Sequence, residues 1–161
     1  LRDVVQAQRK YAAADPDGNG VADYARRFIS SEGKKDGLYW PASPSQAASP
    51  LEALAALAAA QGYARTASAA PQPFHGYPYR MLTAQGKDAS GGARDYRVKG
   101  QLTGGFAFVA YPAKYGVSGF MTFIVNQDGV IYEKNLGTAT ASAAVGMSRY
   151  NPDETWRKAQ P

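Results

Sequence analysis

The sequence lacks cysteine entirely and has no long apolar run. The absence of thiols fits an extracytoplasmic protein that avoids unpaired cysteines, although many cytoplasmic proteins lack them too. A membrane-spanning helix needs roughly 20 consecutive apolar residues, and no stretch approaches that length, so we predict no membrane span within this chain. The pattern of a signal peptide, a basic start followed by an apolar run, is not visible either.

Histidine occurs only once, as His75. A general base needs a partner and a substrate within reach, and the sequence offers no neighbouring serine or aspartate in a recognisable order. No paired carboxylates suggest glycoside hydrolysis, and no glycine-rich stretch has the spacing of a phosphate loop. We therefore predict a hydrogen-bonded structural histidine and a chain that is not an enzyme.

The formal charge is +5, but the basic residues come in ones and twos. Nucleic-acid-binding domains of this size usually cluster their positive charge on one face. The scattered pattern instead predicts a solvated basic surface and no nucleic-acid partner.

The chain opens with an amphipathic helix that lacks the usual start signals. Its apolar face is formed by Leu1, Val4, Val5, Gln8, Tyr11 and Ala12. This helix should end near Ala14, because Asp15 precedes Pro16 and a residue before proline avoids helical dihedral angles. Neither an N-cap residue nor an initiating methionine precedes the helix, so we expect residue 1 to be a processed or fragmentary start.

Two more helices are expected in the first half. One should cover residues 21–28, where apolar residues recur at helical spacing. The other should start at Ser49, which can cap, with Pro50 at the first helical position and Glu52 completing a capping box. Its expected buried stripe consists of Leu51, Leu54 and Leu57 or Ala58. Gly62 would supply the left-handed end of that helix.

From residue 76 the apolar period changes from 3.6 to two, which predicts antiparallel strands. Gln127, Asp128 and Gly129 form a strong hairpin turn signal between two of them. A short Ala-rich helix is expected over residues 138–147, followed by a tail anchored by aromatic residues. The tail aromatics are Tyr150 and Trp156.

Helices followed by an antiparallel meander indicate an α+β fold rather than a parallel sheet. We expect a single domain with the N-terminal helix packed on a sheet of about four strands. Its expected parts are a helical part at 1–62, a linker at 63–75, the sheet at 76–136, and a short helix and tail at 137–161. The predicted core residues are Val4, Val5, Tyr11, Phe106, Phe108, Phe123 and Val125.

An acidic loop at residues 15–23 is the strongest candidate for a ligand site. A calcium loop of the EF-hand kind needs oxygen ligands at positions 1, 3, 5, 7 and 9 and a glycine at position 6. Counted from Asp15, the candidate ligands are Asp15, Asp17, Asn19, the carbonyl of Val21, and Asp23. Gly20 falls on the sharp turn, and the two expected helices flank the loop.

The twelfth position of this loop conflicts with the calcium pattern. It holds Arg26, where the ion needs its strongest carboxylate ligand. Glu32, Asp36 or water would have to substitute. The alternative is a solvated turn, since Asp, Asn and Gly dominate turns that hold no metal. In either case the loop would serve structure, by fixing the angle between the two expected helices.

Tyrosines are numerous in the second half of the chain. They could form a stacking platform for sugars or bases, line a protein interface, or face a half-buried sheet. Trp40 could join such a platform. A small-ligand or carbohydrate-binding module is therefore the alternative to a structural role.

The chain also resembles a known family along nearly its whole length. The stretches that carry the resemblance are AQRKYAAADPDGNGVADYARR, DGLYWP, YRMLTAQG and GGFAFVAYPAKYGVSGFMTFIVNQDGVIYEKNLG. They are similar to the bacterial family called domain of unknown function 2950 (DUF2950). The resemblance implies a secreted or envelope protein with a signal peptide and a further upstream segment. It implies no catalytic residue, because the family name carries no activity.

The layout of a helix, a loop and an antiparallel meander is similar to the globular head of type IV pilins and pseudopilins. This resemblance concerns fold, and a fold analogy does not establish function. Together these features predict a non-catalytic secreted or cell-envelope domain with a structural or interaction role. A pilin-like assembly subunit, or a protein partner bound through an aromatic surface, is the specific hypothesis.

Overall fold

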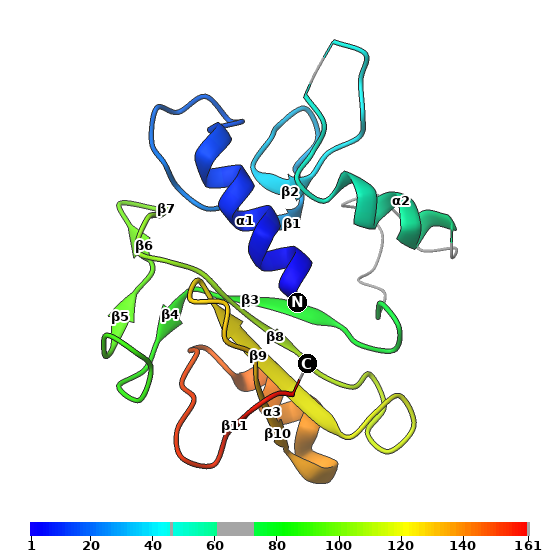
Figure 1. Cartoon of the computed structure of the whole chain (residues 1–161), viewed down its shortest axis with the longest axis vertical. Coiled ribbons are helices and arrows are strands. Elements are labelled where there is room, and N and C mark those ends of the chain that lie inside the picture. Colours follow the sequence, from blue (N-terminus) through cyan, green and yellow to red (C-terminus); the bar gives the residue numbers. More distant parts are fainter. Residues whose placement is uncertain (46, 61–72, 161) are drawn as a thin grey trace. The chain divides into compact units, whose positions relative to one another are not determined.

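Figure 1 shows the computed structural model of the chain, which describes residues 1–45, 47–60 and 73–160. The chain forms two compact units. We call Arg2–Gln72 the N-terminal unit, and Pro73–Pro161 together with Leu1 the sheet unit. Across the described residues, an N-terminal helix and two later α-helices accompany mostly antiparallel strands, which confirms the α+β class. A single-domain organisation and the packing of the first helix on the sheet stay predictions.

The described residues of the N-terminal unit form two α-helices and a pair of short strands. Its elements are α1 (Arg2–Ala14), β1 (Arg27–Ile29), β2 (Gly37–Tyr39) and α2 (Glu52–Ala60). The two strands pair in parallel, with Arg27 opposite Gly37 and Ile29 opposite Tyr39. This parallel pair was not expected from the sequence.

Helix α1 ends as predicted, and its apolar face is buried. The helix expected over residues 21–28 is wrong. The buried Gln8 side chain takes both backbone groups of Ala25, since its Nε2 donates to the Ala25 carbonyl at 2.9 Å and its Oε1 accepts from the Ala25 amide at 2.8 Å. Because those groups are then not available for an intrahelical ladder, the segment runs extended into β1.

Helix α2 begins where the capping pattern places it. The Ser49 hydroxyl donates to the Glu52 carboxylate at 3.0 Å, and the Glu52 amide donates to the Ser49 carbonyl at 3.0 Å. The Leu51 amide donates to the Leu38 carbonyl, which ties the helix start to β2. The predicted buried stripe is wrong at Leu57, which is 52% exposed, because this tie holds only the first turn. Gly62 lies outside the described residues, as does most of the expected linker.

The sheet unit is built on one five-stranded antiparallel sheet with the order β11-β10-β9-β8-β3. Its strands are β3 (Tyr79–Leu82), β8 (Ala107–Ala110), β9 (Met121–Asn126), β10 (Tyr132–Asn135) and β11 (Arg157–Lys158). Two small hairpins lie between β3 and β8 in the chain. They consist of β4 (Ala84–Gln85) with β5 (Arg94–Asp95), and β6 (Arg97–Val98) with β7 (Gln101–Leu102). The expected meander is therefore confirmed, with one more strand supplied by the tail.

The apolar core of the sheet unit centres on β8, which is buried at all four residues. Phe106, Phe108 and Val125 are at most 1% exposed, as predicted. Phe123 is only half-buried. In the N-terminal unit, the predicted core residues Val4, Val5 and Tyr11 are buried as well. Alternation along the strands thus identified most of the core correctly.

The remaining elements follow the predicted order. The turn between β9 and β10 is closed by a bond from the Gly129 amide to the Asn126 carbonyl at 3.0 Å. A 3₁₀ turn, η1 (Gly137–Ala139), leads into α3 (Thr140–Gly146), which is the expected Ala-rich helix. The Arg80 guanidinium on β3 donates to the carbonyls of Ala144 and Met147 and so satisfies the end of that helix. Tyr150 is buried, as expected of a tail anchor.

Candidate functional site

The acidic loop is closed by its own hydrogen bonds. The Asp15 carboxylate accepts from the amides of Asn19 at 3.2 Å and Gly20 at 2.9 Å. The Asn19 side chain then bridges two acids, since its Nδ2 lies 2.9 Å from Asp17 Oδ2 and 3.4 Å from Asp23 Oδ1. The Val21 carbonyl accepts from the Asp23 amide at 2.8 Å. The loop thus gathers all five predicted ligands into one turn-like network.

Burial and charge in this loop work against ionisation of Asp23. Asp23 is only 3% exposed, and this burial, together with the nearby Asp17 carboxylate, raises the pKa of Asp23 even though a hydrogen bond from Asn19 opposes the shift. Burial also raises the pKa of Tyr11, helped by the charges of Asp17 and Asp23. Negative charge therefore gathers at the end of α1, and the nearby Arg26 offsets part of it.

One feature of the structure supports the predicted calcium site, and others weaken it. Within the described residues, Asp17 Oδ1 is a buried oxygen without a hydrogen-bond partner, so it is left for a cation. The expected exit helix is missing, however, and Asp36 bonds instead to the amide and hydroxyl of Ser31. In the described part of the chain, no three acid, histidine or cysteine side chains are grouped so as to hold a metal ion. Calcium binding stays a prediction.

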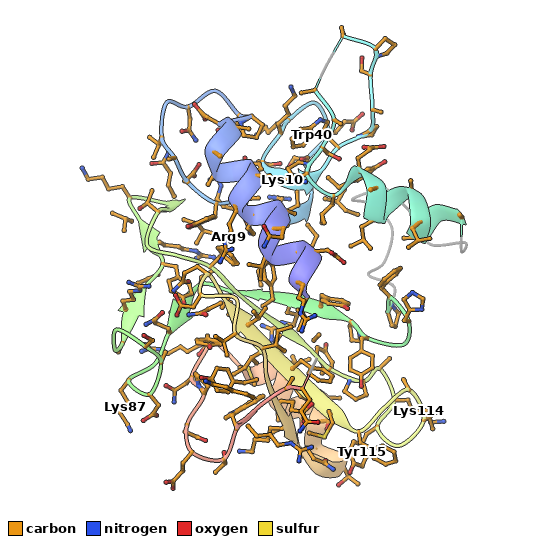
Figure 2. All side chains as sticks on the ribbon, in the orientation of Figure 1. Arg9, Lys10, Trp40, Lys87, Lys114 and Tyr115 are labelled. Atoms are coloured by element: carbon orange, nitrogen blue, oxygen red, sulfur yellow. The ribbon has the colours of Figure 1, made fainter. Side chains whose placement is uncertain are left out.

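The aromatic residues proposed as a stacking platform are partly buried and partly half-buried. Trp40 beside β2 is 5% exposed, and its indole N–H donates to the Ala47 carbonyl at 3.1 Å (Figure 2). Tyr11, Tyr96 and Tyr150 are at most 3% exposed. These rings lie in the cores of the two units and offer no open face to a sugar. The other tyrosines of the proposed platform that the structure describes are half-buried, namely Tyr77, Tyr79, Tyr111, Tyr115 and Tyr132. Tyr63 lies outside the described residues.

His75 is exposed and has a left-handed backbone, with φ of 50°. Its ring stands edge-on to the neighbouring Phe74 ring, with centroids 4.2 Å apart. This contact gives the side chain a place at one end of the sheet unit, beside the loop described next. The structural role expected of this histidine stays a prediction.

The loop between β8 and β9, residues 111–120, combines internal order with exposed apolar side chains. The Gly116 amide donates to the Gly119 carbonyl at 2.9 Å, and the amides of Val117 and Ser118 donate to the Lys114 carbonyl at 3.0 and 2.9 Å. The Ser118 hydroxyl accepts from the Lys114 amide at 3.0 Å. We call this segment the β8–β9 loop. Its backbone is held in one shape without help from its outermost side chains.

Two of those side chains face solvent. Val117 is 73% exposed and Phe120 is 56% exposed, whereas large apolar residues elsewhere in the sheet unit are mainly buried. The Phe120 ring contacts the Tyr115 ring edge-on, with centroids 5.5 Å apart. Lys114 and Tyr115 lie on this loop, at the opposite end of the sheet unit from Lys87 (Figure 2). The loop therefore presents aromatic, aliphatic and basic groups together.

The segment before β3 supports the loop from below. The Ala113 amide donates to the Gly76 carbonyl at 2.8 Å. A Cβ atom on Gly119 would lie 2.1 Å from the Tyr77 hydroxyl, so only glycine allows this close approach. The Tyr77 ring in turn packs on the Phe123 ring, with centroids 5.9 Å apart. The loop that carries Val117 and Phe120 thus packs against the Tyr77 ring, which contacts the Phe123 ring.

A comparison with family models gives one match, to the family described as proteins of unknown function, DUF2950, over residues 1–159. The chain belongs to this family. The DUF2950 resemblance read from the sequence is thereby confirmed. No curated protein and no solved structure matches the chain, so the pilin-like layout stays a prediction. Among the described helices, none combines the length and apolar character that crossing a lipid bilayer requires.

Sequence reasoning found the acidic loop but missed the β8–β9 loop. The stretch YGVSGF was not singled out as a candidate site. The available signal was the position of Val117 and Phe120 next to three small residues, Gly116, Ser118 and Gly119. Small residues cannot cover a neighbouring apolar side chain, so such a loop leaves it exposed.

Proposed function

We propose that this DUF2950 chain is a non-catalytic interaction domain of the bacterial cell envelope or of the secreted fraction, and that it binds its partner through the β8–β9 loop. The observation that carries the proposal is the combination of an ordered loop backbone with Val117 and Phe120 held largely exposed. An exposed aromatic on a rigid support is typical of binding anchors, because no ordering cost is paid on binding.

The alternatives gain less support from the same residues. A carbohydrate module would need open aromatic faces, and Trp40 and the core tyrosines are buried. An enzyme would need a reacting group with an orienting partner and a pocket for a substrate, and the chain's single histidine, His75, is exposed. The absence of a thiol fits the proposed extracytoplasmic location without requiring it.

The direct test is site-specific photo-crosslinking in bacterial cells that export the protein. A benzophenone amino acid replaces Phe120 in one variant and Val98 in a second. Val98 is the matched control, because it is 48% exposed and lies on β6 at the far end of the sheet unit (Figure 1). We expect covalent adducts from position 120 and few or none from position 98.

The outcome distinguishes the possible partners. Adducts with a second copy of the chain would support a self-assembling subunit, adducts with another protein a heteromeric partner, and lipid adducts a membrane surface. Each of these supports an interaction domain. Equal adduct yields at positions 120 and 98, in protein with the wild-type melting temperature, would overturn the proposal.

A further inference from the structure

We propose that the partner of the β8–β9 loop is an anionic lipid surface, into whose interfacial layer Val117 and Phe120 insert while Lys114 contacts the lipid head groups. This inference rests on the proposed interaction function and names its partner. It concerns the surface of a membrane and requires no membrane-spanning segment.

The shape of the loop favours a lipid surface over a folded protein. A standard protein interface buries about 800 Å² on each partner, and an aromatic side chain supplies about 150–250 Å² even when it is wholly buried. Two exposed side chains on one hairpin loop fall well short of that area. A lipid interface needs no matching concave surface, because head groups and acyl chains move aside around an apolar side chain.

The composition of the loop also fits the interfacial layer. Phe120 and Val117 are apolar, and Tyr115 next to Phe120 has a ring with one polar end. Aromatic rings with a polar end are enriched at the level of the head groups. Lys114 extends from the same loop into solvent (Figure 2). The loop thus combines the apolar, aromatic and basic side chains that the interfacial layer favours.

Charge is distributed unevenly over the sheet unit. Residues 73–161 contain ten basic and six acidic residues, a formal charge of +4. The acidic residues are Asp88, Asp95, Asp128, Glu133, Asp153 and Glu154. None of them lies in the segments that build the loop and its base, residues 73–82 and 107–123.

Strand register places most of the acids at the other end of the sheet. β9 begins at the β8–β9 loop, and Asp128 lies in the turn that follows its last residue. The β4–β5 hairpin, with Asp88 and Asp95, follows Leu82, which pairs with the first residue of β8. Asn151 Nδ2 donates to Asp88, which brings the Asp153 segment there too. Glu133, which lies on β10, is paired with Arg157 at 2.8 Å, and Glu154 directly follows Asp153 in the chain. At the other end, the basic residues Lys87, Arg94, Arg97 and Lys99 accompany these acids. Lys114, in contrast, has no acidic residue on its own loop, so an anionic surface can approach it without meeting an acidic side chain there.

Vesicle binding of the purified full chain tests the inference. The probes are vesicles that mix phosphatidylglycerol with phosphatidylcholine, and vesicles of phosphatidylcholine alone. We expect cosedimentation with the anionic vesicles, weakened by salt, and at least about tenfold weaker binding when Val117 and Phe120 are both replaced by serine. Lys114→Gln should weaken binding about fivefold.

Controls keep the result interpretable. The double variant Val98→Ser with Val145→Ser removes two equally exposed apolar residues of the same unit, at 48% and 59% exposure, and should bind like the wild type. Val117→Ser alone leaves the Phe120–Tyr115 ring contact intact and should still weaken binding. No binding to anionic vesicles, or equal losses in the Val117/Phe120 and Val98/Val145 variants, would overturn the lipid inference. If protein adducts still formed at position 120 in cells, the proposed interaction function would stand without it.

Discussion

Each of the two units is stabilised internally by a different kind of contact. In the N-terminal unit, side chains bond to backbone: Gln8 to Ala25, the Tyr11 hydroxyl to the Lys35 carbonyl at 2.6 Å, and Asp36 to the Ser31 amide at 2.8 Å. In the sheet unit, strands bond to strands around an apolar core. Backbone hydrogen bonds between strands follow from the alternation of apolar and polar residues along the chain. Each side-chain-to-backbone hydrogen bond, in contrast, depends on one particular residue.

This difference explains why we assign the proposed interaction surface to one unit only. The buried core and the strand hydrogen bonds stabilise the sheet unit without help from Val117 and Phe120. These two apolar side chains of the β8–β9 loop can therefore stay exposed. The N-terminal unit uses its polar side chains to fix its own path, and its most charged feature, the acidic loop, bonds largely to itself. The interaction surface therefore belongs to the sheet unit in our account.

The sharpest way to break the sheet unit is to remove its central side chain. Phe108 is fully buried, so Phe108→Ala should lower the free energy of unfolding by about 3–5 kcal/mol. The chain has two tryptophans, one in each unit, so Trp40→Phe leaves Trp156 as a reporter of the sheet unit in urea unfolding. Val145→Ala, at a site 59% exposed, should change the value by less than about 0.5 kcal/mol. A loss below about 1 kcal/mol for Phe108→Ala would contradict the assigned core.

The corresponding test of the N-terminal unit is Gln8→Leu. This change leaves the buried amide and carbonyl of Ala25 without their partner, at an expected cost of about 2–4 kcal/mol. Gln6→Leu is the matched control, since Gln6 is exposed on the same helix. Trp156→Phe leaves Trp40 to report on this unit. Equal effects of the two leucine variants would refute the role given to Gln8.

Acid should weaken the N-terminal unit through Asp36. Burial alone would raise the pKa of this carboxyl, but hydrogen bonds from Ser31 and the Arg27 guanidinium at 3.4 Å outweigh it and lower the pKa below its ordinary value of 3.8. A lowered folded-state pKa means that the stabilisation is present above that ordinary value and is lost as the pH falls through the folded-state pKa.

Urea midpoints of the Trp40 reporter, taken between about pH 6 and about pH 2, measure this effect. Asp36→Asn should flatten the decline at the acid end, and Arg27→Gln should flatten it partly. An unchanged acid profile in Asp36→Asn would show that other groups carry the acid sensitivity.

The smallest expected effect concerns the acidic loop. If calcium occupies it, the ion relieves the repulsion between Asp17 and Asp23, and calcium should raise the melting temperature by a few degrees. A chelator should reverse the shift, and Asp17→Asn should abolish it. Identical melting curves with calcium and with chelator would show that the loop is a hydrogen-bonded turn that binds no calcium.

The sequence predicted the sheet unit better than the N-terminal unit, for physical reasons. Alternation along residues 107–110 and 121–126 reports burial directly, so the strands and most of their core residues could be assigned. The turn at Gly129 was visible because its glycine adopts φ of 81°. The added strand β11 was missed, since two exposed basic residues carry no apolar signal.

The errors in the N-terminal unit come from contacts that no local pattern records. Helical spacing at residues 21–28 was real, but the bridge from Gln8, 17 positions away from Ala25, overrides it. The parallel pairing of β1 and β2 rests on three-residue strands, which are too short to show a period. The candidate ligands of the acidic loop were found because Asp, Asn and Gly mark turns. The exposure of Val117 and Phe120 was not predicted, because it depends on how the rest of the chain packs around them.

Hydrogen exchange of the free protein measures the central claim most directly, because the claim requires the β8–β9 loop to be ordered before any partner binds. The amides of Gly116, Val117 and Ser118 are bonded within the loop, so we predict that they exchange at least about tenfold more slowly than in an unfolded peptide. Exchange of all three amides at the unfolded-peptide rate would contradict the account, since Val117 and Phe120 would then sit on a loop without fixed structure.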